Sequence, residues 1–160
     1  MKPSIFQISV KPHTPGEAGL PKMSANQVKI NKSGLEGDYN RWRRKKKKND
    51  PHMAVLIIST DVLSELNKEG WPVRPGDLGE NLTVANIDYE TIAPGQKYSL
   101  GEVEIEISFM CEPCTNLYNL PYVGEKRGPE FMKTLVNRRG WYARVLKESS
   151  VSVGALFQII

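Results

Sequence analysis

The chain has 160 residues, of which 39% are hydrophobic and 25% are charged, as is typical of a globular protein that folds in water. This length predicts a single domain over residues 1–160, with a core large enough to need no disulfide framework. No apolar run is long enough to span a membrane, and the N-terminus lacks the pattern of a secretory signal, so we expect a cytoplasmic protein with no membrane association.

The net charge of +4 is concentrated in one stretch. Seven of the 22 basic residues fall within Arg41–Lys48, and the other 15 face 18 acidic residues, so the rest of the chain has a net charge of −3. A run of like charges repels itself and cannot easily be buried. We therefore expect a mobile, solvated loop here, in preference to a specific site for an anion or a nucleic acid.

The first part of the chain predicts short strands separated by turns. Phe6, Ile8 and Val10 alternate with polar residues and should face the core from one strand. The segment His13–Met23 is rich in glycine and proline and is expected to be a loop, and Val28–Ile30 predicts a second short strand.

A tight turn and a buried strand are predicted next. Gly34–Asp38, with the sequence GLEGD, has two glycines that tolerate positive φ angles. Ala54–Ile58 is a short, continuous apolar run, which favours a central strand buried on both faces. A helix should follow, capped by Ser59 or Thr60 and ended by Gly70.

The strongest strand signal lies within Gly101–Leu117. Apolar and polar residues alternate strictly up to Phe109, as in a strand with one face on the core. Pro113 has no amide hydrogen for a sheet, so strand pairing should stop there. Cys114 should then lie in a loop at the rim, where a thiol is open to chemistry and more reactive than Cys111.

The last part of the chain predicts a second helix and more strands. The helix should begin at Pro129 and end at Gly140, and Trp141–Leu146 should form a strand. A hairpin is expected around Glu148–Ser150. Many short strands with two helices indicate a mainly β, barrel-like fold with the helices packed outside it.

The residue pattern alone leaves the role of the two cysteines open. Cys114 could be an unreactive rim thiol, a catalytic group or a ligand. The pair Cys111 and Cys114 could be half of a zinc site, although His13 and His52, the remaining soft donors, match no standard spacing. A redox dithiol is a third reading.

Five motifs, taken in order along the chain, resemble those of the MOSC domain family. They are LPK at Leu20–Lys22, GLEGD at Gly34–Asp38, GDLGENLTV at Gly76–Val84, PC at Pro113–Cys114 and GWYARVL at Gly140–Leu146. The resemblance covers nearly the whole chain and implies a β-barrel-like fold of the pyruvate-kinase type.

The resemblance also implies a function for Cys114. Some MOSC proteins bind the molybdenum cofactor (molybdopterin) and reduce N-hydroxylated compounds, and others are thought to carry sulfur received from a pyridoxal-phosphate-dependent cysteine desulfurase. Cys114 would then be both the catalytic residue and the metal ligand, since a thiolate is a soft ligand and a nucleophile. A desulfurase or a reductase is the expected partner, together with a small-molecule substrate.

Three further residues are candidates for binding the cofactor. Lys22 lies in a loop where a cation can approach an anion, and Arg144 interrupts an apolar strand, which is costly unless an anion such as phosphate matches its charge. Asn81 is the third, although it could equally be a turn residue that bonds its own backbone. The competing function is a non-catalytic module that binds RNA or another polyanion through Arg41–Lys48, and we consider nucleic acid the less favoured ligand.

Overall fold

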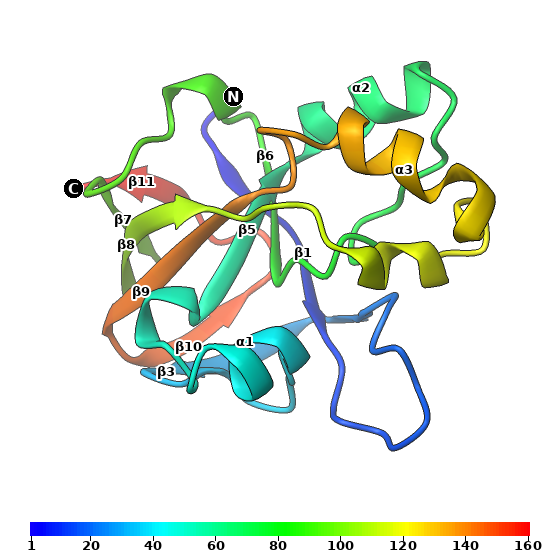
Figure 1. The fold of residues 1–160 in the computed structure, drawn as a ribbon. Helices are drawn as coiled ribbons and strands as arrows, with labels where there is room; N and C mark the ends of the chain where they lie inside the picture. Colours follow the sequence, from blue (N-terminus) through cyan, green and yellow to red (C-terminus); the bar gives the residue numbers. More distant parts are fainter.

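Eleven strands dominate the structure, a computed structural model that describes residues 1–160 (Figure 1). The strands are β1 (Ser4–Val10), β2 (Met23–Ala25), β3 (Gln27–Asn31), β4 (Gly34–Leu35), β5 (Val55–Ser59), β6 (Leu82–Ala85), β7 (Lys97–Leu100), β8 (Val103–Met110), β9 (Trp141–Lys147), β10 (Ser149–Ser152) and β11 (Phe157–Ile159). The α-helices are α1 (Arg41–Lys46), α2 (Thr60–Lys68) and α3 (Gly124–Thr134), and the short 3₁₀ helices are η1 (Pro51–Met53), η2 (Tyr89–Thr91) and η3 (Thr115–Asn119).

Eight strands form one mixed sheet in the order β11-β7-β8-β9-β5-β6-β1-β2, and β10, β3 and β4 form a smaller one. β1 also bonds to the chain just ahead of β11, because the Ile5 N–H donates to the Ala155 carbonyl at 2.9 Å. The large sheet therefore curls back toward its own first strand without closing into a continuous barrel. The predicted mainly β, barrel-like fold class is confirmed.

β5 lies at the centre of the large sheet, as its apolar sequence predicts. It pairs antiparallel with β9 and parallel with β6, and all five of its residues are buried. α2 begins directly after it, because the Ser59 hydroxyl accepts a hydrogen bond from the Val62 N–H at 3.2 Å and so caps the helix. Its buried residues Val62, Leu63 and Leu66 are those expected from the sequence.

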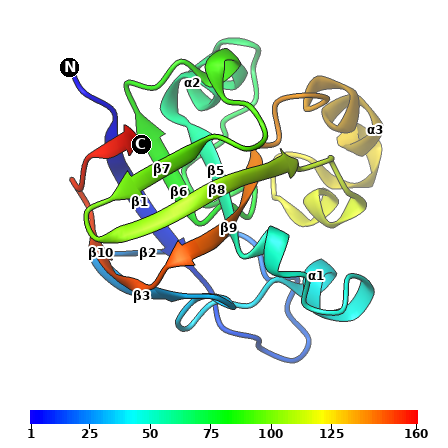
Figure 2. The same ribbon diagram turned by 90° about the vertical axis from the view of Figure 1, so that its left-hand side faces the viewer.

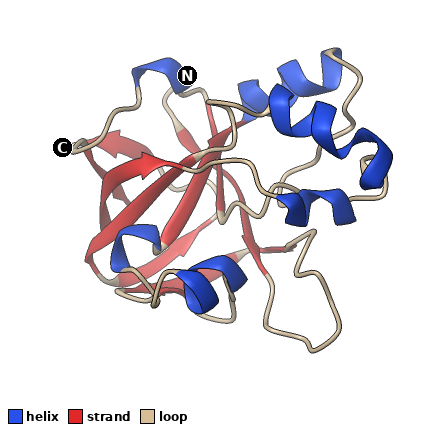
Figure 3. Ribbon diagram, in the orientation of Figure 1, coloured by secondary structure: helices blue, strands red, loops and turns tan.

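The helices lie outside the strands (Figure 3). Trp71, just after α2, packs on Phe131 of α3 with their ring centroids 4.6 Å apart. α1 lies apart from α2 and α3, beside the loop of residues 11–22 (Figures 1 and 2). None of the helices has both the length and the apolar sequence needed to cross a membrane.

The basic run is not the mobile loop that its charge predicts. Residues 41–46 form α1, and the Asn40 side chain caps it by accepting from the Arg43 N–H at 3.0 Å. Arg43 is only 4% exposed, and its Nε donates to the Asp50 carbonyl at 2.7 Å. Backbone carbonyls thus compensate one cation of the run, which allows the helix to pack on the protein.

Bulges change which side chains of two strands face the core. The register of β1 shifts after Ile5, so Ile5 and Ile8 are buried while Phe6, expected inside, is 55% exposed. The register of β8 shifts after Ile107, and Phe109 is 42% exposed. Each bulge inserts an extra residue and reverses the alternation beyond it.

α3 begins earlier than predicted, at Gly124, and Pro129 lies in its middle instead of at its start. It also ends before the expected stop at Gly140. Gly128, in the part of the helix ahead of Pro129, packs directly on Tyr118 of η3, and a side chain at this position would overlap the tyrosine ring.

The chain after β9 does not form the hairpin expected around Glu148–Ser150. β10 instead pairs with β3 in the smaller sheet, where Val151 lies opposite Val28 and both are buried. The partner of this strand is more than 100 residues away along the chain, so local sequence could not indicate it.

Glu80, in the turn before β6, is completely buried. One carboxylate oxygen accepts from the Gly76 N–H at 2.6 Å and the Thr83 hydroxyl at 3.2 Å, and the other has no partner. Burial raises the pKa of Glu80 from 4.5 to about 7. Between about pH 4.5 and pH 7 the folded protein therefore retains a proton that the unfolded chain releases.

We expect Glu80 to lower the free energy of unfolding as the pH rises from about 4.5 to about 7, because the unfolded chain binds fewer protons than the folded one in this range. Glu80→Gln preserves the shape and removes the ionisation. Urea unfolding across this pH range should show the variant gaining stability relative to the wild type as the pH rises. A constant difference between the two proteins would contradict the assignment.

Candidate functional site

Cys114 leaves the large sheet at the end of β8, as Pro113 predicts. The last backbone bond on this side runs from the Cys111 N–H to the Gly140 carbonyl at 2.8 Å. The Cys114 carbonyl then accepts from the Leu117 N–H at 3.1 Å, so this residue begins η3. Its side chain is partly exposed, whereas Cys111 is buried.

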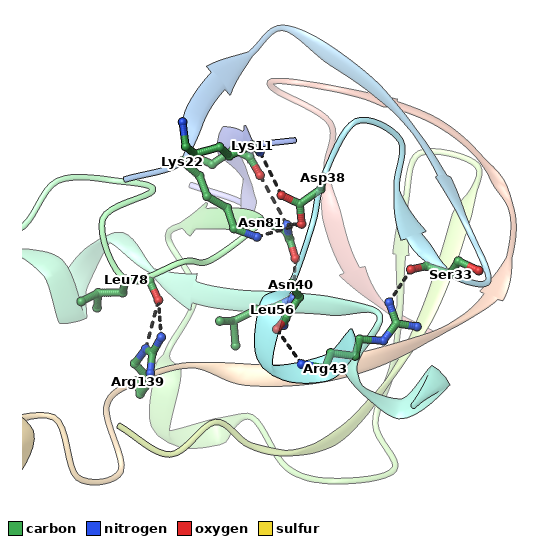
Figure 4. A network of polar contacts seen from close by, with 11 residues as sticks. Lys11, Lys22, Ser33, Asp38, Asn40, Arg43, Leu56, Leu78, Asn81 and Arg139 are labelled. Carbon is green, nitrogen blue, oxygen red and sulfur yellow. Dashed lines mark hydrogen bonds and ion pairs between the residues drawn. The ribbon is translucent and has the colours of Figure 1, made fainter. Parts of the chain in front are cut away.

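Arg139 is the charged group closest to the Cys114 thiol. Its Nη1 lies 3.6 Å from the Cys114 sulfur and also donates to the Glu112 carbonyl at 3.1 Å. Nε and Nη2 both donate to the Leu78 carbonyl, at 3.0 and 2.8 Å (Figure 4). These bonds hold the guanidinium rigidly between the turn before β6 and the loop that carries Cys114.

The buried charge of Arg139 has no carboxylate partner. The side chain is 6% exposed and takes part in none of the ion pairs of the protein. Burial alone acts to lower the pKa of Arg139, but the neighbouring sulfurs of Cys111 and Cys114 outweigh burial and raise it. Because buried charges are normally paired, the natural counter-charge is an anion at Cys114 or on a bound ligand.

Cys114 and Arg139 line a cavity of about 290 Å³, here called the Cys114 cavity. Its walls come from the loop of residues 11–22, from α1, and from the start of η3. The charged residues of the lining are Glu17, Lys22, Arg41, Lys45, Lys46 and Arg139. Lys22 is paired with Asp38 and Glu17 with Lys11, each at 2.8 Å, so Arg41, Lys45, Lys46 and Arg139 are the lining cations without a carboxylate partner. This excess of positive charge favours an anionic ligand.

Comparison with known proteins places the chain in a family. The family model of the MOSC domain matches residues 36–157, which is most of the chain. The chain belongs to the MOSC domain family. This family is associated with molybdenum-cofactor binding and sulfur transfer, and the resemblance seen in the sequence is thereby confirmed.

A curated relative of this MOSC protein is the uncharacterized protein YflK of Bacillus subtilis strain 168, which is 33% identical over 92 residues. The match covers 56% of this chain and 39% of YflK, so the matched part of the chain spans well under half the length of that relative.

Solved structures share its fold. YuaD of Bacillus subtilis has a TM-score of 0.80 and 15% identity, and the match covers 99% of this chain and 96% of YuaD. YiiM of Geobacillus stearothermophilus has a TM-score of 0.74 and 22% identity, with 99% of this chain and 75% of YiiM covered. YiiM of Escherichia coli has a TM-score of 0.68 and 19% identity, with 98% of this chain and 69% of YiiM covered.

Two of the predicted cofactor ligands of this MOSC domain meet at a third residue. Asp38 Oδ2 accepts from Lys22 Nζ at 2.8 Å and from Asn81 Nδ2 at 2.8 Å, and Oδ1 accepts from the Lys11 N–H at 3.0 Å (Figure 4). Asn81 Oδ1 accepts from the Leu56 N–H at 3.0 Å. Lys22 lines the Cys114 cavity, but its charge is already matched, and Asn81 is used in joining strands.

The structure places Arg144 outside the Cys114 cavity. Its Nε lies 2.8 Å from Glu106 Oε1, so a carboxylate on the neighbouring strand β8 matches the charge for which the sequence suggested phosphate. Arg139 is the arginine beside Cys114, and the sequence did not single it out, because it lies within the stretch that was predicted to be the end of a helix. It comes directly before Gly140 and the GWYARVL motif, but only the pairing of β9 with β8 brings it close to the PC motif.

Cys111 lies in a small apolar cluster with Met53, Leu56 and Tyr142. Burial raises the pKa of the Cys111 thiol. No three side chains of the histidine, cysteine, aspartate and glutamate types gather into a group that could hold a metal ion. The arrangement therefore gives Cys111 the character of a packing residue beside the reactive thiol.

Replacing Asp38 by Ala should destabilise the protein by about 3–5 kcal/mol, because Lys22 would remain buried without its counter-charge. The double variant Asp38→Ala with Lys22→Met should recover part of this loss, since both charges are then removed. Urea unfolding measures both values. A double variant no more stable than the single one would show that the ion pair is not what holds this corner together.

Cys114 should react with a thiol alkylator at least ~tenfold faster than Cys111, because a buried thiol reacts only when the protein opens locally. Arg139→Met should slow the labelling of Cys114, since the adjacent positive charge is lost, and Arg139→Lys should preserve part of the rate. Mass spectrometry of the labelled peptides gives both rates. Equal labelling of the two thiols in the folded wild type would contradict a working role for Cys114.

Proposed function

We propose that this MOSC domain binds the molybdenum cofactor with the Cys114 sulfur as a ligand to the metal. The observation that carries the proposal is the buried Arg139 guanidinium, which has no carboxylate partner and lies 3.6 Å from that sulfur. A guanidinium in this position stabilises negative charge on the thiol, and a thiolate is the form that binds a soft metal.

The residues of the Cys114 cavity fit such a ligand. The cofactor carries a phosphate, and the cavity wall presents four cations that have no carboxylate partner. Gly79 lines the cavity with a φ of +83°, and a Cβ atom there would lie 3.2 Å from the Leu20 side chain, so the glycine keeps this wall open. When bound, the cofactor would supply a redox-active metal.

Cys114 and Arg139 would then have distinct tasks. Cys114 would bind the metal through its sulfur, and Arg139 would stabilise the negative charge of that sulfur and keep it oriented. The bonds of Arg139 to the Leu78 and Glu112 carbonyls keep it from moving toward solvent. The reduction of an N-hydroxylated small molecule, with a reductase as electron donor, is the oxidoreductase activity that this site would support.

Sulfur carriage is the second candidate, favoured by the partial exposure of Cys114. The Cys114 thiolate would attack the outer sulfur of a persulfide on a cysteine desulfurase. The sulfur–sulfur bond of the donor breaks and its cysteine leaves as a thiolate, so no external oxidant or reductant is needed. Arg139 would stabilise the persulfide anion formed on Cys114.

Metal and sulfur analysis of the protein purified from its own host tests both functions. We expect molybdenum close to one atom per chain in the wild type, and background levels in Cys114→Ser, because the metal loses its sulfur ligand. Cys111→Ser is the matched control and should retain the metal. Binding requires the free thiol, so alkylation of Cys114 before loading should have the effect of the substitution.

The two functions give different results in this experiment. If the wild-type protein holds no molybdenum, but its intact mass shows an added sulfur atom on Cys114, the result would contradict cofactor binding and support sulfur carriage. A protein that holds neither molybdenum nor bound sulfur, even after incubation with a desulfurase and cysteine, would contradict both.

A further inference from the structure

α1 turns one face toward the Cys114 cavity. Arg41 and Lys45 are one turn apart on this face, as are Trp42 and Lys46, and all four line the cavity. Arg43 points the other way, into the protein, where it donates to the Ser33 and Asp50 carbonyls. This buried anchor fixes the rotation of the short helix (Figure 4).

The cations on this face of α1 are unmatched. Arg41, Lys45 and Lys46 take part in none of the ion pairs of the protein. Arg41 donates through Nη2 to the Glu17 carbonyl, but its Nε is shielded from solvent and has no acceptor. A buried donor without a partner is rare in proteins, and at the wall of a cavity it points to an acceptor on a ligand.

Trp42 adds an aromatic surface beside these cations. Its side chain is 50% exposed, whereas the other two tryptophans, Trp71 and Trp141, are 2% and 7% exposed. The Lys47 ammonium lies 5.7 Å from the centre of the Trp42 ring. An exposed tryptophan on a cavity wall, flanked by cations, is the pattern that binds a heterocyclic base by stacking and its phosphates by charge.

We propose that α1 binds a nucleotide. The phosphates would pair with Arg41, Lys45 and Lys46, and the base would stack on Trp42. The inference rests on the proposed function, because it assigns a nucleotide as the outer part of the ligand whose inner end reaches Cys114. A phosphate alone would use the cations and leave Trp42 unexplained, and an uncharged heterocycle would leave the cations unmatched.

Titration with GDP, CDP or ADP, monitored by tryptophan fluorescence and calorimetry, tests this proposal on the full chain without molybdenum. Trp42 is the exposed tryptophan, so quenching reports the α1 face. We expect saturable binding that is about tenfold tighter than that of inorganic pyrophosphate, corresponding to about 1.4 kcal/mol from stacking.

Variants divide the contribution of the base from that of the phosphates. Trp42→Ala should weaken nucleoside diphosphate binding in calorimetry by about tenfold and leave pyrophosphate binding unchanged. Lys45→Ser with Lys46→Ser should weaken both ligands. Lys126→Ser with Lys133→Ser on α3 is the control of equal charge, away from the cavity, and should weaken neither.

Cys114→Ser separates this inference from the proposed function. The variant should bind nucleoside diphosphate as well as the wild type does, whether or not the protein holds molybdenum. Pyrophosphate binding as tight as that of the nucleotides, with no effect of Trp42→Ala, would overturn the proposal. So would a single-stranded oligonucleotide that binds far more tightly than a nucleoside diphosphate with a steep salt dependence, because α1 would then be a surface for nucleic acid.

Discussion

The buried carboxylate of Asp38 joins four segments that are distant in the sequence. It accepts bonds from the backbone after β1, from Lys22 in the long loop, and from Asn81 in the turn before β6. Asn81 in turn bonds the backbone of Leu56 in β5. The loop that forms one wall of the Cys114 cavity is thereby tied to the centre of the large sheet. Removing this carboxylate would leave Lys22 as an unmatched buried charge and release that wall.

Three buried cations in this protein are compensated in three ways. Lys22 has a carboxylate, and Arg43 has only backbone carbonyls, so burial and the nearby Arg44 lower the pKa of Arg43. Arg139 has carbonyls together with two sulfurs, which raise its pKa despite complete burial. The charges of Lys22 and Arg43 are thus compensated entirely by groups of the protein. The charge of Arg139 needs an anion at Cys114 or on a ligand, and this difference separates a functional arginine from structural cations.

The Cys114 cavity is lined by two kinds of chemical group. Where β8 ends, a thiol beside a rigid guanidinium suits a soft metal or a transferable sulfur atom. On α1, the lining offers unmatched cations and an exposed tryptophan. The buried Arg43 anchors this helix through the Ser33 and Asp50 carbonyls, so that a self-repelling basic run is held as a fixed helix beside the cavity.

Local sequence determined those features that depend on neighbouring residues. The apolar run of β5, the capped helix α2, the alternation of β8 up to Ile107 and the release of Cys114 by Pro113 are all such features, and the structure has each of them. The motifs in chain order also indicated the family and its barrel-like fold. These patterns are readable because each reflects the periodicity of one element or the chemistry of one backbone position.

Tertiary structure alone decided how distant charges are matched. Arg144 meets Glu106 because β8 and β9 pair, and Arg139 meets Cys114 because Gly140 bonds to Cys111 at the end of the same pair. The bulges, the partner of β10 and the burial of Arg43 likewise follow from long-range packing. A buried charge is stabilised by whichever partner the fold brings within a few ångströms, and sequence separation carries no information on that distance.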